Sequence, residues 1–274
     1  MPYTFDLDES AGAAVRRIMH EQIVRAREQL TDSKSPREKR VHDARKRFKE
    51  TRALLRLVRE PLGAQFNTEN VWFRDAGREL AAVRDADAVL EALDKLELPR
   101  ALRNRVKKQL HAKRGEVDID DLIAKTLEQL AIAEARISTW PELDDSFDTI
   151  AAGLVRTYRA GCRAMKGARS AEELHEWRKH VKTHWYHAQL LRQLWPPMMK
   201  AYAAVLEDLS HALGDHHDLH VLRDSVADAP PELLAAIETR QRELEREAEE
   251  IGKRVYAERP RAFVARFEKL WNAR

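Results

Sequence analysis

Two nine-residue segments of the chain, 133 positions apart, carry nearly the same pattern of basic residues. They are VHDARKRFK at 41–49 and LHEWRKHVK at 174–182. The equivalent pairs are His42 and His175, Arg45 and Arg178, Lys46 and Lys179, Lys49 and Lys182, Leu80 and Leu213, and Asp85 and Asp218. One offset that holds across two separated blocks predicts an internal duplication, with two copies of one unit related by a pseudo-twofold axis.

The apolar residues recur at helical spacing almost throughout the chain, and the alternation typical of strands is nearly absent. Helices are predicted over 8–30, 36–60, 65–96, 98–114, 120–139, 145–167, 170–194, 198–226 and 231–272, the last kinked at Pro260. The segment 139–142 is the predicted linker. We therefore predict an all-α fold of two antiparallel bundles of about four helices each, over 8–140 and 141–274, around a basic central channel.

The net charge of the chain, +3, hides a strong segregation of charge. Residues 34–59 hold eleven Lys and Arg against three acids, and residues 156–192 hold nine against three. These two stretches together carry +14, so the rest of the chain sums to −11. Segregated charge steers and binds anions even when the total is small, which predicts an anionic partner.

The basic residues of the first stretch form a stripe at helical spacing, one residue after the apolar set of the same helix. The stripe is His42, Arg45, Lys49, Arg52, Arg56 and Arg59, and the apolar set is Val41, Ala44, Phe48, Leu55 and Val58. In the second copy the stripe is His175, Arg178 and Lys182, interrupted at Trp185 and Gln189 and resumed at Arg192. Like charges at this spacing repel, so we expect an anion against them. The alternative is an ordinary solvated face with acidic neighbours.

Two further basic sets accompany these stripes on the helices that precede them. The set on 145–167 is Arg156, Arg159, Arg163 and Lys166, and the weaker set on 8–30 is Arg16, Arg17, His20 and Arg27. If paired helices place these edges side by side, each half contains a basic trough, and the pseudo-twofold axis joins the two troughs.

The residue types of the stripes favour phosphate, because Arg forks and Lys ammonium groups suit phosphate oxygens. Grooves for single-stranded nucleic acid interleave aromatic residues as stacking platforms, and here only Phe48 is near, in the core phase. A polyanion without bases, or a nucleic acid held by its backbone, fits better. No Gly-rich phosphate loop or Ser/His/Asp set is evident, and Cys162 lies in an apolar phase, which favours a binding protein over an enzyme.

The segment GDHHDLH at 214–220 raises the possibility of a metal site. Adjacent His216 and His217 would point about 100° apart on a helix, which disfavours joint coordination. Asp218 and its equivalent Asp85 are better explained as structural hydrogen-bond acceptors. We expect neither a metal nor a cofactor.

The motif His-x-x-Arg-Lys-x-x-Lys occurs twice, followed by Arg84-Asp85 in the first copy and by Leu-Gly-x-x-x-Asp (213–218) in the second. In order and spacing, these motifs resemble those of the CHAD family, the conserved histidine α-helical domain. The resemblance covers about residues 8–272. The resemblance implies two four-helix bundles around a basic cavity that binds inorganic polyphosphate. The phosphate contacts it implies are His42, Arg45, Lys46, Lys49, Arg52, His175, Arg178, Lys179 and Lys182. His42 and His175 can alternatively bond the preceding helix. Two motif positions differ from the family pattern: Trp185-Tyr186 replaces Arg-Tyr, and Leu80-Ala81 replaces Leu-Gly.

The predicted function is therefore non-catalytic binding of inorganic polyphosphate. The alternatives are a metal-dependent phosphohydrolase acting on phosphate anhydrides and a scaffold that binds the RNA backbone. A single cysteine suggests a reducing cytosol, MPYTFDLDES shows no secretory signal, and no apolar run suggests a membrane span. We expect a cytoplasmic protein associated with polyphosphate granules.

Overall fold

The computed structural model describes residues 3–83, 85–112, 119–226 and 228–273, with side chains given for all of these except 82, 83, 85–87 and 112. Every regular element within these ranges is a helix, which confirms the all-α prediction. None of the described helices combines the length and the apolar character needed to cross a bilayer.

The helices can be grouped by the two predicted repeats. The first repeat contains α1 (Ala11–Thr31), α2 (Arg37–Leu57), α3 (Arg59–Leu62), α4 (Ala64–Glu79), the 3-10 turn η1 (Leu80–Val83), α5 (Asp85–Asp94), α6 (Arg100–Ala112), α7 (Ile119–Arg136) and η2 (Ile137–Thr139). The second contains α8 (Asp148–Gly167), α9 (Ala171–Leu190), η3 (Arg192–Leu194), α10 (Pro196–Ser225), α11 (Pro231–Val255) and α12 (Pro260–Asn272). At the offset of 133, α2 corresponds to α9, and α4 to α5 together correspond to α10.

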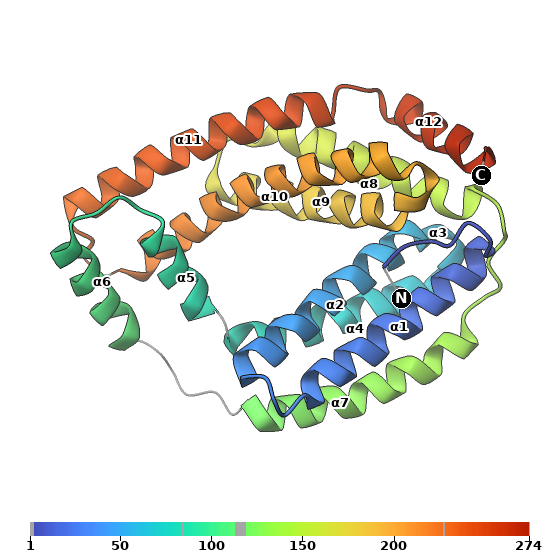
Figure 1. Cartoon of the computed structure of the whole chain (residues 1–274), viewed down its shortest axis with the longest axis horizontal. Helices are drawn as coiled ribbons and strands as arrows, with labels where there is room; N and C mark the ends of the chain where they lie inside the picture. Colours follow the sequence, from blue (N-terminus) through green and yellow to red (C-terminus); the bar gives the residue numbers. More distant parts are fainter. Residues whose placement is uncertain (1–2, 84, 113–118, 227, 274) are drawn as a thin grey trace.

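Two predicted helices are each divided in the structure. The helix predicted over 65–96 is interrupted at η1, after which α5 turns away from α4 and packs against α10 of the other repeat (Figure 1). The helix predicted over 231–272 ends at Val255, and Pro260 opens α12 instead of kinking one long helix. Proline has no N–H to donate, so it suits the first turn of a new helix better than the interior of an existing one.

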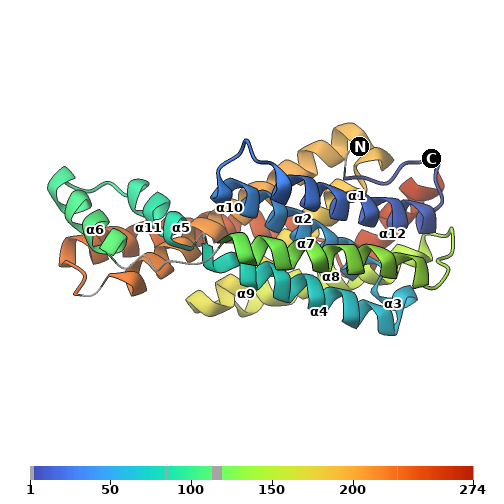
Figure 2. The same ribbon diagram turned by 90° about the horizontal axis from the view of Figure 1, so that it is seen from below.

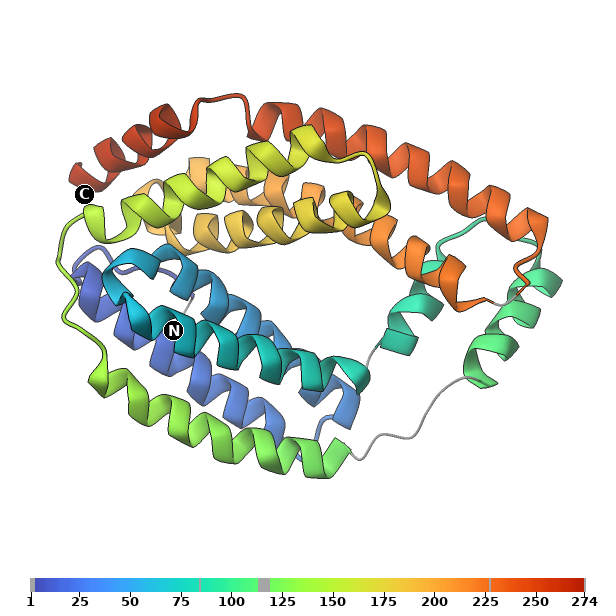
Figure 3. The same cartoon turned by 180° about the vertical axis from the view of Figure 1, so that it is seen from behind.

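The two repeats lie side by side along α2 and α9. Figure 1 shows α8 to α12 on one side and α1 to α4 with α7 on the other, and Figure 3 shows the same division from behind. The α5–α6 pair extends beyond the main body to the far ends of α10 and α11, as Figure 2 shows from below.

The junction between the repeats is tightly packed. A Cβ at Gly153 of α8 would lie 1.9 Å from the carbonyl oxygen of Leu57, so only glycine permits α8 to approach the end of α2 this closely. On α9, His187 is buried, and its Nε2 lies 2.8 Å from the carbonyl oxygen of Ala53 on α2. These contacts fix α2 against both α8 and α9.

The predicted core faces of the two central helices are confirmed by burial. The buried residues of α2 and its C-cap include Val41, Ala44, Phe48, Thr51, Leu55 and Val58, and those of α9 and its C-cap include Leu174, Trp177, Val181, His184, Ala188 and Leu191. The cationic stripes therefore start directly beside the buried faces. Long Arg and Lys stems can pack along apolar neighbours there while their charged ends extend outward.

Candidate polyanion-binding site

A pocket of about 460 Å³ lies between α2, α4 and α9, and we call it the cationic pocket. Its lining residues are Arg45, Phe48, Lys49, Arg52, Arg56, Phe73, Arg74, Gly77, Arg78, Ala81, His175, Arg178, Lys179, Lys182, Thr183 and Tyr186. Nine of them are Lys or Arg, and none of these described lining residues is Asp or Glu. Its volume is in the range of small-molecule binding clefts, and its charge suits an anion.

The cationic pocket joins the stripes of the two repeats. Eight predicted site residues line it, four from α2 and four from α9: Arg45, Lys49, Arg52, Arg56, His175, Arg178, Lys179 and Lys182. They meet because α2 packs against α9, so that the stripe edges of both helices face the same space. The two repeats thus contribute equal numbers of these side chains.

Four of these cations have no acidic partner within ion-pair distance in the described part of the chain: Arg52, Arg56, Arg178 and Lys182. Arg52 donates from Nε to the Asn70 side-chain oxygen at 3.2 Å, and Arg56 donates to the Thr183 hydroxyl oxygen at 3.4 Å. The guanidinium groups of Arg52 and Arg56 therefore donate these bonds to neutral groups, and their positive charge remains available to an incoming anion.

The Arg178 guanidinium lies against Gly214 of α10. A Cβ at position 214 would be 3.2 Å from both Nε and Nη2 of Arg178, closer than ordinary van der Waals contact. The glycine thus makes room for the guanidinium at the wall of the pocket. The equivalent position in the first repeat is Ala81, which also lines the pocket.

The surroundings lower the pKa values of three of the pocket cations, Arg52, Arg56 and Lys182. Burial, followed by the charge of Arg56, Arg74 and Arg78, lowers the pKa of Arg52 to about 10. Burial, followed by the charge of Arg178, lowers the pKa of Lys182 to about 8. The pKa of Arg56 is lowered by burial as well. Clustered, partly desolvated cations destabilise one another, so an anion that neutralises them is favoured.

Trp185, which interrupts the second stripe, and the adjacent Tyr186 lie beneath Lys182. Its Nζ is 4.1 Å from the ring centroid of Trp185 and 5.8 Å from that of Tyr186. Both rings are buried. A cation over the face of an aromatic ring is attracted to it by roughly 0.5–2 kcal/mol. Trp185 therefore contributes to the position of a pocket cation, although it breaks the basic pattern.

Acidic residues occur at the rim of the cationic pocket. Asp75 accepts from Arg74 at 2.7 Å and lies 3.8 Å from Arg78, and Glu176 pairs with Lys179. The side chains of Asp75 and Glu176 are 46% and 60% exposed, and ion pairs open to solvent typically contribute only about 0–1 kcal/mol. A phosphate group that makes several contacts would displace them readily.

Arg74 and Arg78 are the lining cations that the sequence analysis missed. They lie four residues apart on α4 and line the pocket together with Gly77 of α4 and Ala81 of the following turn η1. The sequence signal for these lining cations was a pair of arginines beside a pair of small residues at helical spacing, because small side chains leave space next to the helix that carries them. The short run was not recognisable without the position of α4 opposite α9.

Two predicted contacts of the central helices lie outside the lining. Lys46 is exposed, and its charge acts on Lys182 and Glu50, so it lies close to the pocket without lining it. His42 lies on α2, half-buried, one turn before the lining residue Arg45. Arg84 and the side chain of Asp85 lie outside the described residues.

The arginines of α1 are not part of the cationic pocket, contrary to the predicted trough. Arg16 donates to the carbonyl oxygens of Ile137, Trp140 and Pro141 at 2.7–2.8 Å. Arg17 pairs with Glu9 at 2.8 Å and Glu21 at 3.1 Å. These bonds satisfy both guanidinium groups within the fold, so we assign Arg16 and Arg17 a structural role.

The basic set of α8 also lies apart from the pocket lining. Arg156 pairs with Glu60, and Arg159, Arg163 and Lys166 are exposed on the outer face of α8. This face is not isolated from the pocket, because the charges of both Arg56 and Arg163 depress the pKa of His180, after burial. A long polyanion that leaves the pocket could continue in this direction.

Three histidines of α10, His216, His217 and His220, are engaged in pairwise contacts. The His175 ring, which lines the pocket, stacks on His217 with centroids 3.9 Å apart, and burial lowers the pKa of both. His216 Nε2 lies 3.0 Å from Glu245 Oε1, and His220 lies 3.5 Å from Asp224. The described residues contain no group of three or more side chains suited to hold a metal ion.

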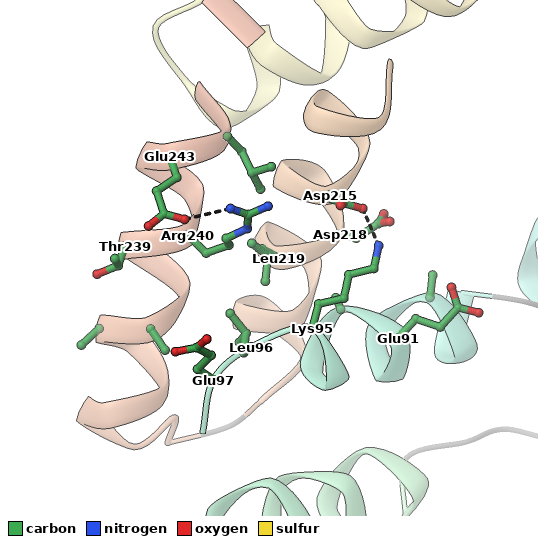
Figure 4. A pocket seen from close by; sticks show the side chains of 15 residues that line it. Glu91, Lys95, Leu96, Glu97, Asp215, Asp218, Leu219, Thr239, Arg240 and Glu243 are labelled. Atoms are coloured by element: carbon green, nitrogen blue, oxygen red, sulfur yellow. Dashed lines mark hydrogen bonds and ion pairs between the residues drawn. The ribbon is translucent and has the colours of Figure 1, made fainter. Parts of the chain in front are cut away.

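A second pocket, of about 670 Å³, lies between α5, α10 and α11 (Figure 4). Its lining includes five acids and two bases, of which Lys95 pairs with Asp215 at 2.7 Å and Arg240 with Glu243 at 2.8 Å. Its acidic excess would repel a polyanion. The cationic pocket is therefore the better candidate site, although it is smaller.

Comparison with known proteins supports the family indicated by the motifs. No curated protein matches the chain. The sequence model of the CHAD domain matches residues 17–227, which include all of α2, α4 and α9 and therefore every helix that lines the cationic pocket. Because this match covers well over half of the sequence, the chain belongs to the CHAD domain family.

Proposed function

We propose that the protein binds inorganic polyphosphate non-covalently in the cationic pocket. The observation that carries the proposal is the convergence of nine Lys and Arg side chains from both repeats, with no carboxylate among the described lining residues. Arg178, Arg52 and Lys182 provide charge without an internal acidic partner in the described chain. Guanidinium forks bind phosphate oxygens in bidentate geometry, and the ammonium group adds a compact charge.

The lining favours a phosphate polymer over a nucleic acid. Phe48, Phe73 and Tyr186 are the aromatic lining residues, and each has at most 3% of its surface exposed. Buried rings cannot serve as stacking platforms for bases, which single-strand binding sites use. A polymer that consists of phosphate alone needs only the cations.

We infer binding without chemistry. Catalysis on phosphate anhydrides commonly uses carboxylate-held metal ions, and no described lining residue is a carboxylate. The lining hydroxyls are those of Tyr186, whose pKa is raised by burial, and of Thr183, which donates to the Lys179 carbonyl oxygen at 2.9 Å and accepts from Arg56. Neither of the two hydrogen-bond partners of the Thr183 hydroxyl is a base that would activate it as a nucleophile.

We also propose that the protein is located in the cytoplasm. A polyphosphate-binding protein with a single half-buried cysteine, whose pKa is raised by burial, is suited to the reducing cytoplasm. There it would associate with polyphosphate granules, the largest local store of the proposed ligand.

A salt-resolved titration tests the proposal. Polyphosphate is titrated against the protein and against a variant with Arg45, Lys49, Arg178 and Lys182 changed to Ala. The matched control changes four exposed cations of α11, which do not line the pocket: Arg242, Arg246, Lys253 and Arg254. Both variants lose four charges, so the difference between them isolates position from net charge.

The pocket variant should lose at least a hundredfold in affinity, and the slope of log affinity against log salt should become shallower by up to about 3. The control should change little. Equal losses in the two variants would show that overall charge, not the pocket, binds the polymer. Stronger competition by tRNA at equal phosphate concentration would favour the RNA-scaffold alternative, and phosphate release on addition of Mg²⁺ would favour the phosphohydrolase.

A further inference from the structure

Lys182 differs from Lys179, its neighbour in the cationic pocket, in what surrounds the amine. Lys179 is paired with Glu176 and is 53% exposed. Lys182 is half-buried, lies over the rings of Trp185 and Tyr186, and has no acidic partner within ion-pair distance in the described chain. The Lys182 amine is thus open to the pocket, and no ion pair ties it down.

Charges from three helices act on this amine. Arg178 of α9 and Lys46 of α2 disfavour its protonated form, whereas Glu207 of α10 and Glu50 of α2 favour it. Burial and the two cations prevail, which lowers its pKa to about 8. A substantial fraction of the amine is therefore neutral near pH 8, and a neutral amine is a nucleophile.

The same pocket supplies the groups that would hold a phosphate leaving group. Arg52, Arg56 and Arg178 line it together with Lys182. A small molecule with a phosphate at one end and an electrophilic carbon at the other would be held by its phosphate, beside the amine. Acyl phosphates have this structure.

We propose that Lys182 is a site of acylation by acyl phosphates bound in the cationic pocket. The Nζ lone pair attacks the carbonyl carbon, and an amide C–N bond forms. The C–O bond to the phosphate breaks, and inorganic phosphate leaves with that electron pair. The proton lost from the nitrogen passes to phosphate or water, so no other reactant is needed. This inference shares with the proposed function the assumption that the pocket accepts phosphate groups.

The expected selectivity follows from the proton equilibrium. At pH 8, an amine with the ordinary pKa of 10.5 is about 0.3% neutral, whereas Lys182 is about half neutral, a difference of about 150-fold. A lower pKa also weakens a nucleophile, which by analogy with thiolates reduces the advantage to about tenfold. Capture of the acyl phosphate has two opposing effects: the bound phosphate charge raises the pKa of Lys182 and reduces its neutral fraction, and the pocket raises the local concentration of the reagent. The tenfold advantage is therefore the expectation taken from the free amine.

Acylation would also act on polyphosphate binding. It removes one of the pocket charges and places an amide and an acyl chain over Trp185. Because Lys182 lies among the lining cations, the acylated protein should bind polyphosphate at least tenfold more weakly than the unmodified protein.

The test uses the full chain and acetyl phosphate at pH 8, with site-resolved acetylation followed by mass spectrometry. Lys182 should react at least ten times faster than Lys179 and than exposed Lys166 on α8. Saturating inorganic pyrophosphate should suppress the reaction at Lys182 and leave that at Lys166 unchanged. A Lys182 rate no higher than that of Lys166, or one that pyrophosphate does not slow, would overturn the proposal.

A second reagent separates capture of the phosphate from reactivity of the amine. 4-Nitrophenyl acetate acylates amines but carries no phosphate. Changing Arg56→Gln should slow acetylation of Lys182 by acetyl phosphate severalfold and leave its reaction with 4-nitrophenyl acetate unchanged. Equal slowing with both reagents would contradict capture by the pocket. If polyphosphate binds in the titration described above while Lys182 remains unreactive, this inference alone fails and the proposed function stands.

Discussion

Polyphosphate binding should be accompanied by proton uptake at Lys182. In the free protein, burial and the charge of Arg178 lower the pKa of Lys182 to about 8. A bound phosphate polymer stabilises the ammonium form and therefore raises the pKa. If the ordinary value of 10.5 is restored, the coupling between proton and polymer is about 3 kcal/mol.

The size of the effect depends on pH in a defined way. At pH 8.5, Lys182 of the free protein is about one quarter protonated and that of the complex is almost fully protonated, so binding takes up about 0.75 proton. At pH 7.5 the uptake from Lys182 is about 0.25 proton. Affinity should therefore fall as pH rises from about 8 towards 10.5, by up to tenfold per pH unit.

Isothermal titration calorimetry in buffers of different ionisation enthalpy measures this uptake directly. The control is Lys182→Arg, because an arginine at this position keeps its charge and should abolish the uptake at pH 8.5 without removing a cation. An uptake near zero at pH 8.5, or one that Lys182→Arg leaves unchanged, would refute the reasoning.

Three further predictions concern the fold and the wall of the cationic pocket. Gly214→Ala should reduce polyphosphate affinity roughly threefold to tenfold in a binding titration, because the new Cβ would lie 3.2 Å from the Arg178 guanidinium. The same change should raise the stability measured by urea unfolding by up to about 1 kcal/mol, because alanine favours a helix more than glycine does. Arg136→Ala should lower the free energy of unfolding by about 3–5 kcal/mol, since it leaves the fully buried Glu69, which now accepts two bonds of 2.8 Å, without a partner. Burial lowers the pKa of His187 to about 4, so between about pH 6.5 and pH 4 the folded protein binds fewer protons than the unfolded chain. The free energy of unfolding should therefore fall as the pH drops through this range, by up to about 1.4 kcal/mol per pH unit.

Each of these three predictions has a matched control. Gly167→Ala, at the end of α8 and outside the lining, adds a Cβ with no other atom within 4 Å, so it should leave affinity unchanged; an equal loss there would contradict the role given to Gly214. Replacing Arg136 and Glu69 together by Leu and Met should recover most of the lost stability, and failure to do so would point to packing instead of charge. His187→Gln should flatten the acid dependence, and an unaltered slope would mean that other groups cause it.

The sequence predicted the faces of the central helices well. The apolar phases of α2 and α9 placed Phe48 and Val181 in the core, and both are buried. It also placed the cationic stripes one residue later, which is where Arg52 and Arg178 reach the pocket. Helical phase depends only on the fixed turn per residue, so it is readable wherever a helix is correctly located.

Contacts between distant helices were not readable in the same way. Arg16 was predicted as a site residue, but it bonds carbonyl oxygens more than one hundred residues away, around Ile137 and Trp140. Arg74 and Arg78 were overlooked, although they line the pocket. A basic side chain has the same local pattern whether it faces an internal carbonyl, a rim carboxylate or a vacant pocket.

The amino-acid sequence by itself determined that the chain is helical, that it is duplicated at an offset of 133, and that each copy carries cations beside its core face. Only the tertiary structure decided that α2 and α9 pack together, so that their cations and those of α4 line one pocket while Arg16 and Arg17 serve the fold. The physical reason is that the two kinds of information act over different distances along the chain. Periodicity records which side of a helix avoids water, whereas the partner of each charge depends on how helices far apart in the chain pack against one another.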